Sequence, residues 1–177
     1  MAKDRPMTGN TPESGPKRNL GIHIDRVSKG FATPDGTRTS VFENLSISFE
    51  PNQLHVVMGT SGCGKSTLGY LLAGFTTPDS GRVTLDSEPV KGPSPERLLV
   101  FQETALWPWM TVLENVIFGP KVRGEAATKT LKTTANELLA KFGLAEFSDR
   151  YPDQLSGGMK RRAEIAQALI NRPKVMI

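Results

Sequence analysis

Residues 59–67, Gly-Thr-Ser-Gly-Cys-Gly-Lys-Ser-Thr, have the spacing G-x-x-x-x-G-K-[ST] that cradles phosphate groups. Glycine reaches the backbone dihedrals that aim several N–H groups at one point, and it leaves room for a phosphate beside the backbone. Lys65 would reach the terminal phosphates of a nucleotide, and the Ser66 hydroxyl would ligate Mg²⁺. The candidate nucleotide-binding residues are Gly59, Ser61, Gly62, Cys63, Gly64, Lys65, Ser66 and Thr67.

Two elements must position this loop. Residues 54–58, Leu-His-Val-Val-Met, are a continuous apolar run that predicts a strand buried on both faces of a parallel sheet. A helix is predicted to begin near Lys65 and to continue through residues 68–73, so that the positive end of its dipole lies at the phosphate site. The alternative is a glycine-rich turn without a ligand, which the flanking strand and helix make the weaker interpretation.

The composition is that of one globular domain. The 177 residues are 37% hydrophobic and 23% charged, as in soluble proteins. No apolar run is long enough to span a bilayer and the N-terminus lacks the apolar centre of a secretory signal, so a cytosolic protein is expected. The net charge of +4 indicates a mildly basic, solvated surface. The single cysteine, Cys63, excludes an internal disulfide.

The N-terminal half predicts a leader and a small antiparallel sheet. Residues 1–19 carry proline, glycine and scattered charges without apolar periodicity, which predicts a disordered leader. Alternation from residue 20 to Val27 and from 41 to 49, with a turn between them, predicts two antiparallel strands. Further strands are predicted at residues 82–85 and, buried, at 98–101.

The C-terminal half is mostly helical in pattern. Thr111 and Glu114 have the spacing of a capping box that opens a helix through about Phe118. A second helix is predicted over residues 126–142 and a third from Ser156 to about residue 170, before a strand that starts at 175.

The stretch of residues 155–159, Leu-Ser-Gly-Gly-Met, completes a set of motifs. Together with the loop at 59–67 and the Gln102 that follows a predicted strand, it strongly resembles the nucleotide-binding subunits of ABC transporters, from about Leu20 to Ile177. The resemblance implies an α/β fold: a P-loop NTPase core with an antiparallel β subdomain and a helical insert at about residues 103–155. The signature residues are Leu155, Ser156, Gly157, Gly158 and Met159.

The resemblance also implies residue roles. The signature would contact the γ-phosphate of ATP held by the P-loop of a second copy, which gives a head-to-tail dimer with two ATP molecules. Gln102 would be the catalytic glutamine of the Q-loop and a ligand of Mg²⁺ beside Ser66, and Phe31 would stack on adenine. The alternatives are an ordinary capped helix at Ser156 and a core aromatic at Phe31.

Residues 106–110, Leu-Trp-Pro-Trp-Met, are large apolar residues in a predicted loop. Such a patch is typical of a binding surface, with packing beneath the insert as the alternative. The resemblance implies that the region around Trp107 and Met110 docks the membrane-spanning permease, at the cytoplasmic face of the inner membrane. It implies a periplasmic solute-binding protein as an indirect partner and no nucleic acid.

Several residues depart from the family pattern. Arg161 stands where the family usually has Gln, Gln167 where it usually has Arg, and Glu164 replaces a more apolar residue. Met159 and the Pro-Trp pair after Gln102 are typical of the branch that serves nitrate, sulfonate and taurine uptake. The resemblance therefore implies an importer of a similar small solute, driven by ATP-dependent dimerisation.

The family's Walker B carboxylates are absent. Residues 175–177 resemble the opening of that strand, but neither its Asp nor its Glu follows, and no His follows His55. The resemblance thus implies a C-terminally incomplete chain that does not hydrolyse ATP by itself. His23 and His55 are expected to have structural roles. The alternatives are a non-catalytic nucleotide-binding module and an ABC ATPase without a membrane partner. A P-loop kinase leaves the signature unexplained.

Overall fold

The computed structural model describes residues 21–125 and 128–177, so the leader predicted for residues 1–19 lies outside the described residues. The elements in chain order are β1 (Ile22–Ala32), β2 (Arg38–Phe49), α1 (Lys65–Ala73), β3 (Ser80–Leu85), β4 (Glu88–Pro89), β5 (Arg97–Leu98), α2 (Val112–Val122), α3 (Thr128–Lys141), the short 3₁₀ helices η1 (Ala145–Phe147) and η2 (Pro152–Gln154), α4 (Gly157–Leu169) and β6 (Val175–Met176).

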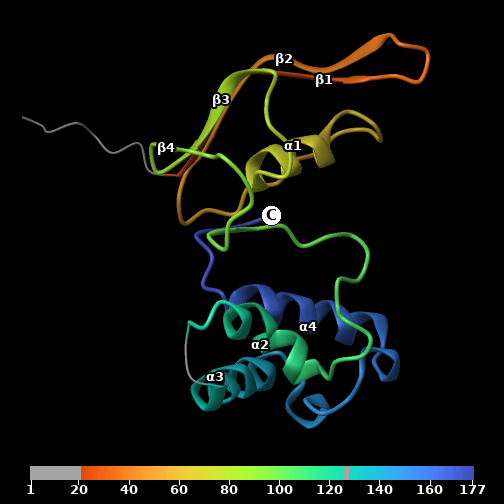
Figure 1. Ribbon diagram of the computed structural model, residues 1–177, viewed down its shortest axis with the longest axis vertical. Helices are drawn as coiled ribbons and strands as arrows, with labels where there is room; N and C mark the ends of the chain where they lie inside the picture. The colour runs from red at the N-terminus through yellow and green to blue at the C-terminus, as the bar shows by residue number, and fades with distance from the viewer. Residues whose placement is uncertain (1–20, 126–127) are drawn as a thin grey trace, which may run out of the picture.

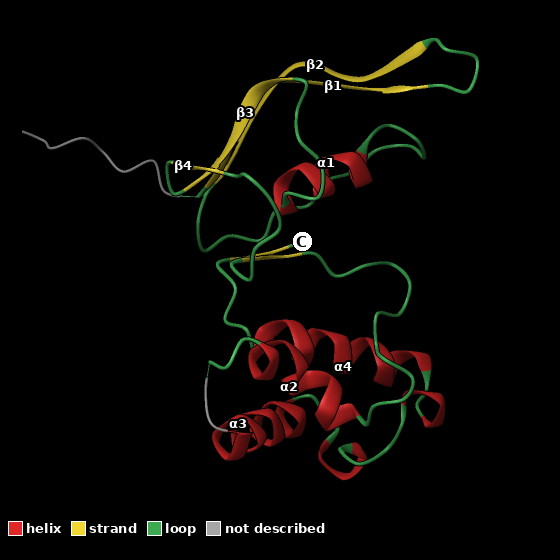
Figure 2. Cartoon of the chain, in the orientation of Figure 1, coloured by secondary structure: helices red, strands yellow, loops and turns green. Residues whose placement is uncertain are grey.

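These elements form two groups. Figure 1 shows the sheet of β1 to β4 with α1 at the top and the helices α2, α3 and α4 at the bottom. The short parallel pair β5 and β6 lies between them (Figure 2).

The predicted antiparallel hairpin is confirmed. β1 pairs with β2 on one side and with β3 on the other, which gives the order β2-β1-β3-β4. The register shifts after Ile24, where Arg26 has a φ of +49°, and this bulge returns Val27 to the face that carries Ile24. Val27 is therefore fully buried, more deeply than the alternation alone predicted.

The apolar face of this sheet packs on α1. Leu68, Leu71 and Leu72 recur at helical spacing and bury against the strands. The helix begins at Lys65, as predicted, and ends at Gly74, whose φ of +85° suits a glycine C-cap. The sheet residues in this cluster are Ile22, Ile24, Val27, Val83 and Leu85. This packing fixes the end of α1 at which the P-loop lies.

The strand predicted at residues 54–58 is wrong. The structure has no strand there, and the side chains of Leu54 and Met58 are 92% and 87% exposed. An isolated strand leaves its N–H and C=O groups without ladder partners, so an apolar run becomes a strand only where a neighbour pairs with it. Among the described residues, no strand pairs with 54–58.

The strand predicted at residues 98–101 is only partly correct. β5 pairs in parallel with β6, and the ladder continues where Val100 N–H donates to the Ile177 carbonyl at 2.7 Å. Phe101 lies outside the strand and is exposed. The strand predicted to start at residue 175 is confirmed as β6.

The helical predictions are confirmed in outline. Thr111 caps α2, accepting from the Glu114 N–H while the Glu114 carboxylate accepts from the Thr111 N–H. The helix runs four residues past the predicted end at Phe118, because the buried Pro120 is accommodated within it. The ends of α3 and α4 lie within two residues of the predictions, apart from residues 126–127, which are not described. An apolar cluster joins the three helices: Val112, Val116, Ile117, Leu131, Leu139, Ala163 and Ala166 are among its members.

A network at Asp86 ties the sheet to β6. Asp86 accepts from the Gly21 N–H at 3.1 Å and pairs at 3.2 Å with Lys174, which also pairs with Glu96. The Gly21 hydrogen bond, and after it Lys174, lower the pKa of Asp86 from its usual value. A carboxyl whose pKa is depressed by folding stabilises the fold above its unfolded pKa of about 3.9, and this stabilisation is lost as the pH falls through the folded pKa.

We therefore expect Asp86→Asn to lower the free energy of unfolding at neutral pH, and this difference to shrink as the pH falls below about 4 and through the lowered pKa of Asp86. Asparagine tolerates the positive φ of +51° at this position, so backbone strain does not confound the comparison. Urea unfolding of both proteins across this pH range measures the difference. A difference that stays constant with pH would contradict the assignment.

Candidate functional site

The loop before α1 has the backbone that phosphate binding requires. Gly62 and Gly64 have φ values of +79° and +98°, in the left-handed region that favours glycine. Gly64 is the N-cap of α1 and offers no side chain to the helix. The first-turn N–H groups of α1 are therefore not capped by a side chain, and they point toward the loop, where an anion would complete them.

The loop also contacts the sheet. A Cβ at Gly64 would lie 2.8 Å from Val41 and 2.9 Å from Phe42, so β2 approaches closely only because residue 64 is glycine. A Cβ at Gly59 would lie 2.5 Å from the sulfur of Cys63. Glycine at these two positions therefore keeps the loop compact as well as open to a ligand.

Lys65 is bound to its own loop. Its Nζ donates to the carbonyl of Gly59 at 2.8 Å and to the carbonyl of Thr60 at 2.7 Å. These acceptors are neutral, whereas phosphate oxygens carry negative charge and attract an ammonium group more strongly. Lys65 thus lies where it can exchange two carbonyl partners for a nucleotide's phosphates.

The two hydroxyls that follow differ in exposure. Ser66 is exposed in the first turn of α1, whereas Thr67 is half-buried. No three His, Cys, Asp or Glu side chains gather to hold a metal within residues 21–125 and 128–177. The hydroxyl of Ser66 and the side-chain carbonyl of Gln102 are oxygen donors of the kind that suits Mg²⁺, so their role as its ligands remains a prediction.

Gln102 is exposed in the segment that follows β5. It lines a shallow pocket with Tyr70 of α1 and with its neighbours Phe101 and Glu103. The ring of Phe101 contacts that of Phe75, just beyond α1, with centroids 5.9 Å apart. The structure thus brings the Q-loop, residues 101–105, to the side of the P-loop helix, although it shows no hydrogen bond from the Gln102 side chain to a described residue.

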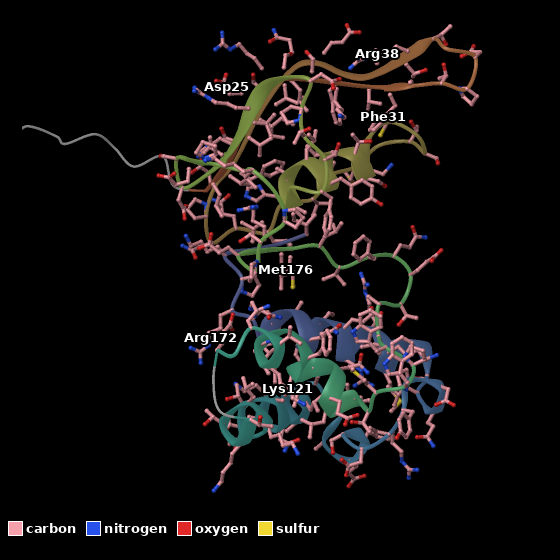
Figure 3. All side chains as sticks on the ribbon, viewed as in Figure 1. Asp25, Phe31, Arg38, Lys121, Arg172 and Met176 are labelled. Carbon is pink, nitrogen blue, oxygen red and sulfur yellow. The ribbon has the colours of Figure 1, made fainter. Side chains whose placement is uncertain are left out.

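Phe31 lies near the tip of the β1–β2 arm (Figure 3). Its ring is 44% exposed, so it is not the core aromatic of the alternative interpretation. The Nζ of Lys29 lies 5.2 Å from the ring centroid, a cation–π contact. The same arm reaches the P-loop through Phe42. An adenine-stacking role remains a prediction for this ring.

The signature begins α4. Leu155 is buried, and Ser156 is the N-cap, accepting from the Met159 N–H at 3.3 Å. Gly157 and Gly158 are exposed, with open space where a Cβ would be. Figure 1 shows α4 in the lower group and α1 in the upper one, so one chain does not bring its own signature to its own P-loop.

The loop at 106–110 has one buried anchor and an exposed aromatic surface. Leu106 is buried, whereas Trp109 is 66% exposed and stacks at 5.2 Å on the partly exposed Trp107. The buried Leu106 thus agrees with the packing interpretation, and the exposed Trp109 agrees with the binding-surface interpretation. No helix in the described ranges, 21–125 and 128–177, is long and apolar enough to cross a membrane.

Asn115 was not predicted from the sequence, yet it organises this loop. It is fully buried in α2; its Oδ1 accepts from the Trp107 N–H, and its Nδ2 donates to the carbonyls of Trp107, Met110 and Thr111 at 3.0–3.1 Å. The available signal was an asparagine on the apolar face of a predicted helix. Such a residue must find hydrogen-bond partners when buried.

Arg161 and Glu164 were noticed only as departures from the family pattern. The structure shows that both contact the Q-loop: Arg161 donates to the Phe101 carbonyl and Glu164 accepts from the Ala105 N–H. The two histidines, by contrast, have structural partners. His23 contacts the Ser48 hydroxyl at 2.9 Å and His55 the Glu50 carbonyl at 3.0 Å.

Cys63 gives a chemical test of the site. It is exposed, and its sulfur lies 3.8 Å from the Lys65 Nζ. We expect a maleimide at Cys63 to abolish MgATP binding, because the adduct occupies the loop. MgATP at about ten times its Kd should slow labelling about tenfold, in proportion to the fraction of free protein. Calorimetry and mass spectrometry measure the two effects, with Cys63→Ser as the unreactive control. Unchanged binding after complete labelling would contradict this placement.

Comparison with known proteins identifies a family and several relatives that match most of this chain. Residues 42–177 match the family model described as ABC transporter. The chain is 40% identical over 173 residues to a nitrate import ATP-binding protein of Synechococcus elongatus, covering 97% of this chain and 63% of the relative. It is 44% identical over 156 residues to a taurine import ATP-binding protein of Pseudomonas fluorescens, covering 88% and 58%. The chain thus spans about three fifths of the length of these curated relatives.

A solved structure has the same fold. It is described as the dimeric structure of a bacterial ABC transporter cassette, and it is 28% identical to this chain. The superposition has a TM-score of 0.77 and covers 88% of this chain and 72% of that one.

Proposed function

The chain belongs to the ABC transporter family, and from this premise we propose that it binds ATP and Mg²⁺ to energise an importer of a small solute. The single observation that carries the proposal is the arrangement at Lys65. An ammonium group that donates to two carbonyls of its own loop and has no acidic partner among the described residues, at a helix N-terminus without a side-chain cap, is prepared for an anion.

Different residues of the chain would bind different parts of the nucleotide. Backbone N–H groups near Gly62 and Gly64 and the Lys65 ammonium would bind the phosphates, while Ser66 and Gln102 would ligate Mg²⁺. Phe31 would stack on the base. ATP, when bound, supplies the γ-phosphoryl group whose hydrolysis releases the free energy for transport. Gln102 would orient the attacking water in the complete ATPase.

Dimerisation is the second part of the proposal. Ser156, Gly157 and Gly158 lie at an open helix N-terminus, far along the chain from the P-loop and in the other group of elements. They would contact the γ-phosphate held by a second copy, so that ATP joins two chains head to tail. The dimeric cassette among the solved structures supports this arrangement.

The solute and the membrane partner are proposed from the relatives. Two relatives are named as nitrate and taurine import proteins, and Met159 matches the expectation for that branch. The exposed pair Trp107 and Trp109 would dock the permease at the cytoplasmic face of the inner membrane, with a periplasmic solute-binding protein as an indirect partner.

Three measurements test the proposal. Calorimetric titration with MgATP should give saturable binding, and sedimentation should show an MgATP-dependent dimer that AMP does not induce. Affinity capture from membranes of the source organism should recover a permease, and Trp109→Ala should reduce its yield. A chain that does not bind MgATP would contradict the nucleotide role. Capture of nucleic acid instead of a permease would favour an ABC ATPase without a membrane partner.

A further inference from the structure

One ion pair on the signature helix contacts both ends of the Q-loop. Arg161 Nη1 donates to the Phe101 carbonyl at 2.6 Å, and Glu164 Oε1 accepts from the Ala105 N–H at 2.9 Å. The two side chains are joined to each other, with Arg161 Nη1 3.2 Å from Glu164 Oε2. Residues 161 and 164 are one helical turn apart, so their side chains lie on the same face of α4.

The ion pair of Arg161 and Glu164 holds the Q-loop, residues 101–105, by hydrogen bonds. Among the described residues, Gln102, Glu103 and Thr104 form no hydrogen bond, so residues 101–105 are hydrogen-bonded only at their two ends. Both bonds go to the same ion pair. A movement of α4 would therefore displace the segment, and Gln102 lies one residue after the Phe101 carbonyl that is bound.

Burial makes this arrangement stronger than a surface ion pair. The Glu164 side chain is only 6% exposed, and a buried carboxylate needs partners for both of its oxygens. Here the Ala105 N–H and Arg161 satisfy them. Arg161 is half-exposed, and it spans from the buried carboxylate to the Phe101 carbonyl.

On its other side the segment contacts the P-loop helix. The ring of Phe101 lies 5.9 Å from that of Phe75, which lies 6.4 Å from that of Tyr70 in α1. A continuous series of contacts thus runs from α1 through the Q-loop to α4. Ser156 lies at the N-terminus of α4, eight residues before Glu164, or about 12 Å along the helix.

We propose that Arg161 and Glu164 are positioning residues that join the Q-loop to the signature helix and set the place of Gln102. The proposal rests on the proposed function, because Gln102 matters to transport only if the P-loop holds ATP. It adds that Gln102, which would ligate Mg²⁺ and orient the water that attacks the γ-phosphate, moves as one unit with the signature of the same chain through this ion pair.

Amide exchange tests the hydrogen-bonded arrangement in the protein itself. We expect Glu164→Ala to accelerate hydrogen exchange of the Ala105 N–H at least about tenfold, because it removes the acceptor of this N–H, and Arg161→Ala to accelerate it several-fold, because it removes a partner of the buried Glu164 carboxylate. The Leu71 amide of α1 should exchange as in the wild type. Arg161→Lys, which keeps a positive donor, should restore part of the protection.

Nucleotide affinity tests the consequence for Gln102. Arg161→Ala and Glu164→Gln should each weaken MgATP about tenfold and change MgADP by less than about twofold, because only ATP presents a γ-phosphate to the glutamine. Arg162→Ala is the matched control, since this neighbouring arginine donates to the Phe142 carbonyl in the helical group. It should leave both affinities unchanged.

The outcomes are separable. Wild-type exchange of Ala105 in both alanine variants would overturn the proposal, as would an equal loss of MgATP and MgADP affinity. If Glu164→Ala does not fold, Arg161→Ala still tests the proposal, because Arg161 is half-exposed and its replacement disturbs the fold less. A wild-type chain that ignores MgATP would contradict the proposed function, whereas the exchange of Ala105 would still decide whether the ion pair positions the Q-loop.

Discussion

Replacing Lys65 by alanine is expected to weaken MgATP binding about 100-fold, equivalent to about 2.7 kcal/mol. Within the described chain the Lys65 ammonium contacts only groups of its own loop, two carbonyls and the Cys63 sulfur, so its removal costs the free protein little. In the complex, the same substitution removes charge-assisted hydrogen bonds to the phosphates. Calorimetric titration measures the loss.

Lys121→Ala is the matched control. Lys121 is an exposed lysine of α2 in the other group of elements (Figure 3), so its removal changes the net charge equally without touching the loop. Its MgATP affinity should equal that of the wild type. If Lys65→Ala and Lys121→Ala weakened binding to the same extent, the effect would be one of net charge. The assignment of the phosphate site to residues 59–67 would then be lost.

Local chemistry made much of this structure predictable. The capping box at Thr111 and Glu114 and the serine N-cap at Ser156 are each satisfied within one helical turn, so three or four residues of sequence contain the whole interaction. The glycines of the phosphate loop are similar, because the positive φ of Gly62 and Gly64 is a property of the residue itself. Such local features depend little on contacts with distant segments of the chain.

Pairing between distant segments was not predictable in the same way. The apolar run at 54–58 has the composition of a buried strand, but a strand exists only with a hydrogen-bonded neighbour, and none of the described strands lies beside it. Of the strand predicted at residues 98–101, only Leu98 belongs to a described strand, β5, which pairs with β6. The composition of these two segments correctly indicated that they are apolar, but it predicted their secondary structure only in part.

The polar residues that organise the site were the hardest to foresee. Arg161 and Glu164 lie about 60 residues from the Q-loop that they contact, and their spacing alone predicts nothing more than a surface pair on a helix. Only the fold brings the Ala105 N–H to the buried Glu164 carboxylate. For the same reason the sequence did not assign a role to Asn115.

Replacing Asn115 by alanine is expected to lower the free energy of unfolding by about 2–4 kcal/mol. The asparagine is fully buried, and its amide satisfies four backbone groups of Trp107, Met110 and Thr111. Alanine leaves the Trp107 N–H and the Met110 carbonyl without partners and opens space in the helical cluster, whereas the carbonyls of Trp107 and Thr111 keep a backbone donor. Asn115→Asp keeps the shape but sets a carboxylate against three carbonyl oxygens, so it should be at least as destabilising.

The measurement uses the chain's own fluorophores. The only two tryptophans, Trp107 and Trp109, lie in the loop that Asn115 organises, so their emission reports directly on that loop during urea unfolding. Asn136→Ala is the matched control, because Asn136 is exposed on α3 and alanine has the higher helix propensity. It should be neutral or slightly stabilising. If Asn115→Ala were equally harmless, the loop would be held by the packing of Leu106 rather than by this amide, and the proposed permease surface would not depend on α2.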